Sequence, residues 1–206
     1  MTDNLNSVKM GQSYHHGNLR QSLLESAINL ISEKGVEGFS LRETARRAGV
    51  SPAAPKHHFA DSRALLTALA TSAFTDLASA LEQANIDAPP DDALRLQAQG
   101  TAYIRFALGA PALFGLMWRS ARLDMEDAAL LTAKQRAFVA LDHVVRGEDA
   151  EQITLEDPAM DRTMAHWALV HGLAGLALDN LFGDESNRKQ VLDAVTPRLV
   201  ALIAAR

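Results

Sequence analysis

Basic and imidazole side chains lie close together in one short segment, RRAGVSPAAPKHHF at residues 46–59. Arginine and lysine neutralise phosphates, and arginine also pairs with the major-groove edge of guanine. Histidine can add a positive charge when it is protonated, or it can ligate a metal. The segment therefore indicates either contact with nucleic acid or a metal site, and the elements around it discriminate between the two.

The adjacent histidines, His57 and His58, do not favour a metal site. Side chains of neighbouring residues on a helix point about 100° apart, and no pair of carboxylates stands three or four residues away. The chain also contains no cysteine, which removes thiolate ligands, a cysteine nucleophile and disulfides. We expect neither a metal nor a cofactor.

Catalytic groups are sparse in the rest of the chain. Catalysis needs a nucleophile, a base and a stabilising group within reach of one another. The strongest combination is His171 followed two turns later by Asp179, without a positioned serine or a Glu-x-x-His pair. No phosphate-binding glycine-rich loop or dinucleotide fingerprint occurs. We predict that the protein is not an enzyme; an enzyme or a ligand carrier is the alternative, and neither should bind random DNA in a salt-dependent way.

Apolar residues recur with helical spacing through almost the whole chain, and no stretch alternates in the manner of a β-strand. Residues 18–34 form one such helix, which Gly35 stops. Ser40 caps the next helix, and Glu43 is expected to bond back to the Ser40 amide. The predicted fold class is all-α.

Two of the predicted helices are short and lie close together in the sequence. Gly49 suits the left-handed position after the helix 41–48. Ser51 and Pro52 then begin a second helix at 52–58. Two short helices joined by a three-residue turn form a helix-turn-helix, whose second helix can enter the major groove. An ordinary helical hairpin is the alternative, and the basic exposed face argues against it.

Charge is unevenly distributed along the 206 residues. The net charge of −5 by itself argues against nucleic-acid binding. Residues 1–66 nevertheless hold eight Lys and Arg against six Asp and Glu, whereas residues 67–206 hold twelve against nineteen. No apolar run is long enough to span a bilayer, and the N-terminus lacks a signal-peptide pattern. We expect a cytoplasmic protein with no membrane partner.

The N-terminal part, YHHGNLRQSLLESAINLISEKGVEGFSLRETARRAGVSPAAPKHHFADSRALLTALA, resembles the three-helix DNA-binding domain of TetR-type transcriptional repressors. The likeness runs continuously from Tyr14 to Ala70. It includes the Gly35 turn, the run SLRETARRAGVS, the pair His58-Phe59 and the pair Leu65-Leu66. Further along, WALVHG at 167–172 is similar to the Trp-x-x-x-His-Gly signature of one C-terminal subclass.

The resemblance implies a domain organisation and a function. An N-terminal three-helix helix-turn-helix domain is expected at 14–62, followed by an antiparallel helical ligand-binding and dimerisation domain at 63–206. Residues 1–13 carry Lys9 as their one positive charge, so a disordered tail is expected there rather than a DNA-gripping arm. Such a repressor would bind a palindromic double-stranded DNA operator as a homodimer. A small apolar or amphipathic effector would release it, with the linking helix 62–83 as the lever.

The same resemblance locates the DNA contacts. Arg42 is the candidate for reading a guanine, and its alternative is a solvated charge near a helix start. The family usually has Tyr where Lys56 stands and Lys where Ser62 stands, so these phosphate contacts differ here. The expected DNA-binding residues are Arg42, Ser51, Pro52, Ala53, Ala54, Lys56, His57, His58 and Arg63.

Bulky apolar residues in the second domain provide the inducer pocket that the resemblance implies. Trp167 and His171, one turn apart, would add a polar edge to it. For each residue of this set the alternative is a place in the ordinary core. The candidates are Phe106, Phe114, Met117, Trp118, Met125, Phe138, Trp167 and His171.

Two further helices have the pattern of a subunit interface. Residues 164–178 are apolar on nearly every side, so this helix needs cover from more than its own domain. The last helix, about 187–205, carries one apolar stripe. Together they suit a four-helix interface between two copies, and the alternative is that both belong to a monomer core. The expected interface residues are Leu169, Gly172, Leu173, Leu176, Val191, Val195, Leu199 and Leu202.

Overall fold

The structure, a computed structural model, describes residues 16–146 and 158–204. Within these ranges all regular structure is helical, which confirms the predicted all-α class. The predicted tail at 1–13 lies outside the described residues. The helices in order are α1 (His16–Lys34), α2 (Leu41–Arg47), the 3-10 helix η1 (Ala54–His57), α3 (Ser62–Asp87), α4 (Asp92–Gly109), α5 (Pro111–Met117), the 3-10 helix η2 (Ser120–Arg122), α6 (Ala128–Arg146), α7 (Pro158–Leu178) and α8 (Glu185–Ala204).

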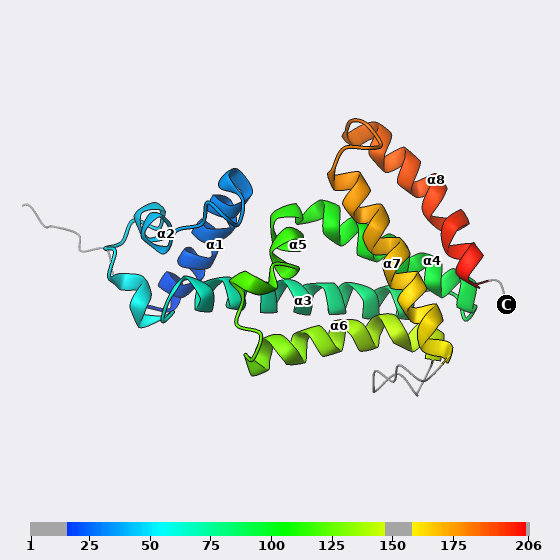
Figure 1. Ribbon diagram of the computed structural model, residues 1–206, viewed down its shortest axis with the longest axis horizontal. Helices are drawn as coiled ribbons and strands as arrows, with labels where there is room; N and C mark the ends of the chain where they lie inside the picture. Colours follow the sequence, from blue (N-terminus) through cyan, green and yellow to red (C-terminus); the bar gives the residue numbers. More distant parts are fainter. Residues whose placement is uncertain (1–15, 147–157, 205–206) are drawn as a thin grey trace, which may run out of the picture.

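The molecule is elongated, with a small helical head at one end and a larger helical body (Figure 1). The head consists of α1, α2 and η1, and α3 runs from it through the whole body. α4 returns along α3 towards the head, α5 turns the chain, and α6 runs back beside α3 in the same direction. α7 and α8 form an antiparallel pair that packs on α4. The head therefore connects to the body through α3, with α5 and η2 lying between them.

α3 is the central helix of the molecule. It begins where predicted, because the Asp61 carboxylate accepts a hydrogen bond from the Ala64 N–H at 2.8 Å. It continues to Asp87, one turn beyond the predicted end. By length and composition α3 could also span a bilayer, which the sequence pattern did not predict. Here its apolar side chains, from Leu65 to Leu81, are buried in a core that is continuous from head to body.

The prediction of a helix at 52–58 is wrong, because this segment forms only the 3-10 turn η1. Pro55 explains the difference, because proline has no N–H and its ring clashes with the carbonyl four residues earlier in an α-helix. Hydrogen bonds instead join residues three apart, from Lys56 N to Ala53 O at 3.2 Å and from His58 N to Pro55 O at 2.9 Å. Pro55 is buried, so it also anchors the turn.

The predicted capping box at the start of α2 is only half formed. The Ser40 hydroxyl accepts a hydrogen bond from the Glu43 N–H at 3.4 Å. The Glu43 carboxylate does not return to the Ser40 amide; it pairs with Arg46 and Arg47 instead. Two guanidinium groups on the same helix compete for this carboxylate, and Arg46 offers it a positive charge and two parallel hydrogen bonds, which a single backbone amide cannot.

The predicted left-handed glycine after α2 is confirmed, since Gly49 has φ 71°. Gly49→Ala should therefore lower the free energy of unfolding by about 1–2 kcal/mol, because an L side chain is strained in this conformation. A clash is not the cause, as no atom lies within 4 Å of the added Cβ. Urea denaturation measures the loss. Gly115→Ala is the matched control: its Cβ also meets open space, but its φ is not positive, so stability should hold or rise. Equal losses in both variants would contradict the explanation.

Candidate DNA-binding surface and ligand cavity

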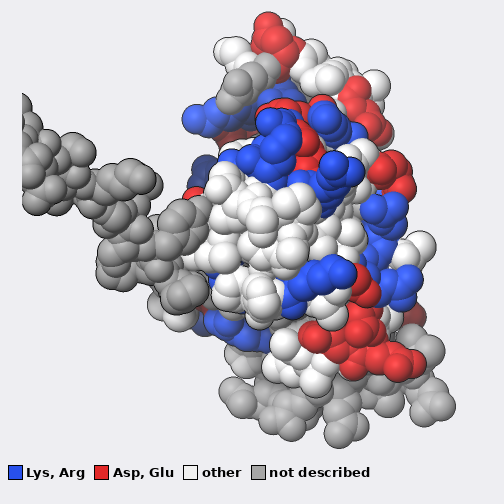
Figure 2. Space-filling view, turned by 90° about the vertical axis from the view of Figure 1, so that its left-hand side faces the viewer, with Lys and Arg blue, Asp and Glu red and all other residues white. Residues whose placement is uncertain are grey.

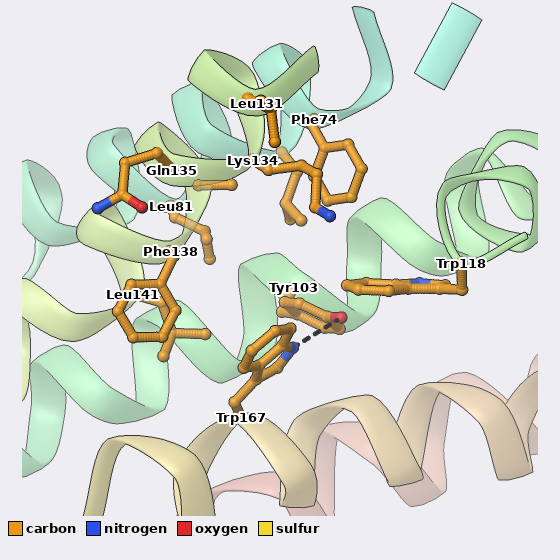
Figure 3. Close-up of a pocket in the computed structure, with 12 residues that line it drawn as sticks. Phe74, Leu81, Tyr103, Trp118, Leu131, Lys134, Gln135, Phe138, Leu141 and Trp167 are labelled. Atoms are coloured by element: carbon orange, nitrogen blue, oxygen red, sulfur yellow. Dashed lines mark hydrogen bonds between the residues drawn. The ribbon is translucent and has the colours of Figure 1, made fainter. Parts of the chain in front are cut away.

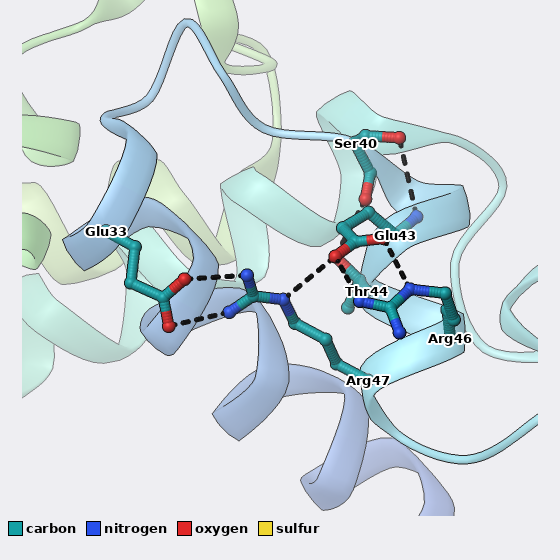
Figure 4. A network of polar contacts seen from close by, with 6 residues as sticks. All are labelled: Glu33, Ser40, Glu43, Thr44, Arg46 and Arg47. Carbon is teal, nitrogen blue, oxygen red and sulfur yellow. Dashed lines mark hydrogen bonds and ion pairs between the residues drawn. The ribbon is translucent and has the colours of Figure 1, made fainter.

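An ion-pair network holds α2 against α1 (Figure 4). Arg47 donates two hydrogen bonds to Glu33 of α1, from Nη1 to Oε1 at 2.8 Å and from Nη2 to Oε2 at 2.6 Å. Its Nε donates to Glu43 at 3.2 Å, and Glu43 also accepts two hydrogen bonds from Arg46, at 2.8 and 2.7 Å. Bidentate pairs of this kind define orientation as well as distance. The network therefore sets the rotation of α2 on the head.

The same network distributes the charge of α2. Hydrogen bonds from Arg46 and then Arg47 lower the pKa of Glu43 to about 2, and the hydrogen bond from Arg47 lowers the pKa of Glu33. Both carboxylates are ionised at neutral pH and compensate Arg46 and Arg47. Of the three arginines of α2, all within the described residues, Arg42 alone takes part in no ion pair. Arg42 is exposed, so its charge remains available to a partner.

The residues expected to contact DNA lie at the head end of the molecule. Figure 2 views this end and shows Lys and Arg side chains gathered around a patch of uncharged side chains. Two of the expected residues, Ala54 and His58, are half-buried. The exposed ones are Arg42, Ser51, Pro52, Ala53, Lys56, His57 and Arg63.

The head carries a further basic residue, on α1, that the sequence analysis did not select as a DNA contact. Arg20 of α1 is exposed, and its guanidinium carbon lies 5.3 Å from the centroid of the Phe59 ring. This distance is within the range of a cation–π contact. Phe59 itself is buried, so Arg20 covers the ring on the outside. The basic surface therefore extends from α2 and η1 onto α1.

A cavity of about 330 Å³ lies in the body between α3, α4, α6 and α7 (Figure 3). Three of the predicted pocket residues line it: Trp118, Phe138 and Trp167. The remaining lining residues are Phe74, Leu77, Leu81, Tyr103, Leu131, Lys134, Gln135, Ala137 and Leu141. The lining residues that belong to α6 recur at helical spacing along one face of that helix. This periodicity could have been recognised in the sequence.

The other predicted pocket residues do not line this cavity. Phe114 and His171 pack against Trp118, and their ring centroids lie 6.1 and 4.8 Å from the centroid of the Trp118 ring. Met117 is part of the core, and Met125 is exposed on the surface. Phe106 lines a separate groove that Pro197 of α8 borders.

The inner wall of the cavity carries a chain of hydrogen bonds. Trp167 Nε1 donates to the Tyr103 hydroxyl at 3.4 Å, and this hydroxyl lies 2.9 Å from His171 Nδ1. Burial raises the pKa of Tyr103 and lowers the pKa of His171. A neutral tyrosine therefore donates to a neutral imidazole at physiological pH, and the polar groups of this wall satisfy one another.

The predicted interface residues differ in their exposure to solvent. Leu173 is 6% exposed and belongs to the core of its own chain, so it is not available to a partner. Leu169, Val191, Val195 and Leu199 are half-buried, and Gly172, Leu176 and Leu202 are exposed. A Cβ added at Gly172 or Gly175 would meet no atom within 4 Å, so this part of α7 presents an open face.

The fold and its basic head define a helix-turn-helix transcription regulator with a helical body. Residues 23–69 match the family described as bacterial regulatory proteins, tetR family, and residues 96–199 match the tetracyclin repressor-like C-terminal domain. The chain therefore belongs to the TetR family of transcription regulators, and it is not an enzyme. The Trp-x-x-x-His-Gly subclass stays a prediction.

Individual proteins show the same likeness. Over 56 residues the chain is 39% identical to tetracycline repressor protein class C of Escherichia coli. This match covers 27% of the chain and 26% of that repressor, so the chain spans about a quarter of the curated relative. A protein with unknown function from Rhodococcus sp. RHA1 has a similar structure, with 34% identity, a TM-score of 0.74, and coverage of 93% of this chain and 98% of that one.

Two more distant structures share the fold. A TetR family transcription regulator from Marinobacter aquaeolei VT8 is 20% identical, with a TM-score of 0.66 over 91% of this chain and 95% of that one. The transcriptional regulator FadR from Bacillus subtilis, solved in complex with stearoyl-CoA, is 13% identical, with a TM-score of 0.67 over 87% and 96%. At these identities the likeness concerns the fold alone.

Proposed function

We propose that this protein is a cytoplasmic, ligand-responsive repressor that binds a palindromic operator as a homodimer and releases it when a small molecule occupies the cavity. A helix-turn-helix domain at 14–62 would bind DNA, and the segment 63–206 would bind the ligand and dimerise. The observation that carries the proposal is the continuity of α3. It begins beside the basic head and supplies Phe74, Leu77 and Leu81 to the cavity wall.

A second connection between cavity and head supports this coupling. Arg122 of η2 donates to the Glu37 carboxylate at 3.1 Å and to the Val36 carbonyl at 3.3 Å, both just after α1. Trp118 lines the cavity four residues earlier. A ligand that moves Trp118 would therefore also move the segment that holds the head. The ligand would weaken operator binding, and the free energy lost is the difference between its binding free energies for the two head positions.

Dimerisation would place two heads on one operator. The exposed face of α7 around Gly172 and the exposed Leu202 of α8 are the candidate contact. A two-fold dimer matches a palindromic site, with its two reading elements about 34–36 Å apart in successive major grooves. Because η1 is a short turn, we expect α2 to share the reading of bases through Arg42.

Selection of bound sequences from random duplex DNA tests the proposal. The protein should enrich a two-fold symmetric site, and Arg42→Ala should lose about 1–3 kcal/mol of discrimination at one base pair in each half-site. Arg105→Ala, which removes an exposed arginine of α4 in the body, is the matched control and should leave the selected sequence unchanged. Failure to enrich any symmetric site, even at low salt, would contradict the repressor function.

A further inference from the structure

The cavity is lined mainly by apolar and aromatic side chains, together with two polar side chains of α6, Lys134 and Gln135. Among the described residues that line it, Lys134 is the one with a formal charge. Lys134 is half-buried, and Figure 3 shows its ammonium group directed into the space between Phe74 and Trp118. A cation in such surroundings is stabilised only if an anion or water compensates it.

The protein supplies no counter-ion to Lys134 within the described residues. None of the ion pairs there includes it. The positions three and four residues away on α6, where a helical partner would stand, are all apolar. They are Leu130, Leu131, Ala137 and Phe138. The ammonium group is therefore available to a bound molecule.

The other polar groups of the wall indicate which end of a ligand is polar. The Tyr103 hydroxyl and Trp167 Nε1 are already hydrogen-bonded to each other, so the inner wall requires no polar partner. Trp118 Nε1, in contrast, is buried and has no partner among the described residues. The two groups without partners, on Lys134 and Trp118, are both donors. A ligand that satisfies them must supply acceptors and a negative charge.

We propose that the effector is a monocarboxylate with an apolar body of one or two rings. Its carboxylate pairs with Lys134, and its body packs against Trp118, Trp167 and Phe138. A single lysine matches a single negative charge, and about 330 Å³ stands at the lower end of the range for small-molecule sites. An aromatic wall would also attract an organic cation, but Lys134 repels one. This assignment rests on the proposed function, because it takes the cavity as the effector site.

Three matched probes test the assignment: 4-phenylbutanoate, its neutral amide 4-phenylbutanamide, and 4-phenylbutylammonium. The chain contains two tryptophans, Trp118 and Trp167, and both line the cavity, so tryptophan fluorescence of the full-length protein reports binding there. The carboxylate should bind about tenfold more tightly than the amide or better, since a hydrogen bond to a charged group is the stronger one. The ammonium probe should bind most weakly.

Lys134→Met retains the apolar stem and removes the charge. It should bind the carboxylate no more tightly than the amide, with the affinity for the amide unchanged. Lys34→Met, which removes an exposed charge at the end of α1, is the matched control and should keep the preference. Thermal unfolding verifies that both variants fold, and Lys134→Gln provides a second neutral variant. Absence of saturable carboxylate binding, equal binding of carboxylate and amide, or a preference that persists in Lys134→Met would overturn the assignment.

A second readout separates this assignment from the function on which it rests. The selected operator fragment, bound to the protein, is titrated with the carboxylate and with the amide. If the carboxylate binds through Lys134 but leaves the DNA bound, the assigned class of ligand is supported. The proposal that this ligand releases the operator is then contradicted. If the amide binds and releases DNA as well as the carboxylate does, the repressor function stands and the ligand class is wrong.

Discussion

Acidification from about pH 7 to pH 4 should remove about 3 kcal/mol of the free energy of unfolding through the single side chain of His166. His166 of α7 is fully buried, and neither ring nitrogen has a partner among the described residues. The ring packs against α4 at Gly100: a Cβ added to this glycine would lie 3.6 Å from the His166 Cε1 atom. Desolvation in this position lowers the pKa of His166 from 6.5 to about 4.

The direction of the effect follows from where the proton binds. Between about pH 6.5 and pH 4 the unfolded chain takes up a proton at His166 and the folded chain does not. The stability associated with the neutral ring is therefore complete above pH 6.5, declines as the pH falls, and stops declining once the folded ring is protonated too. At about 1.4 kcal/mol per pKa unit, the difference between 6.5 and about 4 has a limiting value of about 3.5 kcal/mol. About 3 kcal/mol of this is lost by pH 4, where the folded ring is half protonated.

Urea denaturation of the wild type and of His166→Leu at both pH values measures this contribution. Leucine fills a similar apolar space without a titrating group, so the variant should lose about 3 kcal/mol less on acidification than the wild type. His57→Leu is the control, because His57 is exposed and its removal should leave the pH dependence of the wild type. Identical pH dependence in wild type and His166→Leu would contradict the role of His166.

Asp142→Ala should destabilise the protein by about 3–5 kcal/mol, because it breaks a buried ion pair at the end of α6. Asp142 is fully buried, and the Arg146 side chain is 3% exposed. Arg146 Nε donates to Asp142 Oδ2 at 2.7 Å, and the Thr163 hydroxyl of α7 donates to Oδ1 at 2.5 Å. Without the carboxylate, a buried guanidinium loses one of its partners and a buried hydroxyl loses its acceptor, so the junction of α6 and α7 is weakened.

Two comparisons make the measurement specific. Glu82→Ala removes the ion pair of Arg136 with Glu82, which is partly exposed to solvent, and should change the midpoint of urea denaturation little. The double variant Asp142→Leu, Arg146→Met removes both buried charges together and should recover most of the stability lost in Asp142→Ala. If Asp142→Ala unfolds at the same urea concentration as Glu82→Ala, the buried pair contributes no more than a surface pair and the explanation is wrong.

Local chemistry in the sequence was sufficient to predict the helices and several of their ends. Asp61 begins α3 through a hydrogen bond to a residue three positions on, and Gly49 ends α2 through its own backbone freedom. Both effects depend on neighbours within one turn, so they can be recognised without a tertiary structure. The error at 52–58 was also local in origin, since Pro55 is incompatible with an α-helix at that point.

Pairing among charged groups could be predicted only in part. Ser40 and Glu43 have the spacing of a capping box, but the Glu43 carboxylate has two arginines within reach and bonds to them instead. Arg47 is in turn shared with Glu33, which is fourteen residues away and on another helix. Competition of this kind depends on distances across the head. For the same reason, only the structure identified Arg42 as the unpaired arginine of α2.

The sequence by itself determined the helical class, the apolar face of most helices, and the family to which the chain belongs. Only the tertiary structure decided which apolar residues face a cavity and which fill the core. Phe106 and Met125 do not line the cavity, Leu173 is buried in the core of its own chain, and Tyr103 and Lys134 line the cavity wall. The physical reason is that periodicity specifies a buried face of one helix, whereas a cavity arises where several helices cross without filling the space between them.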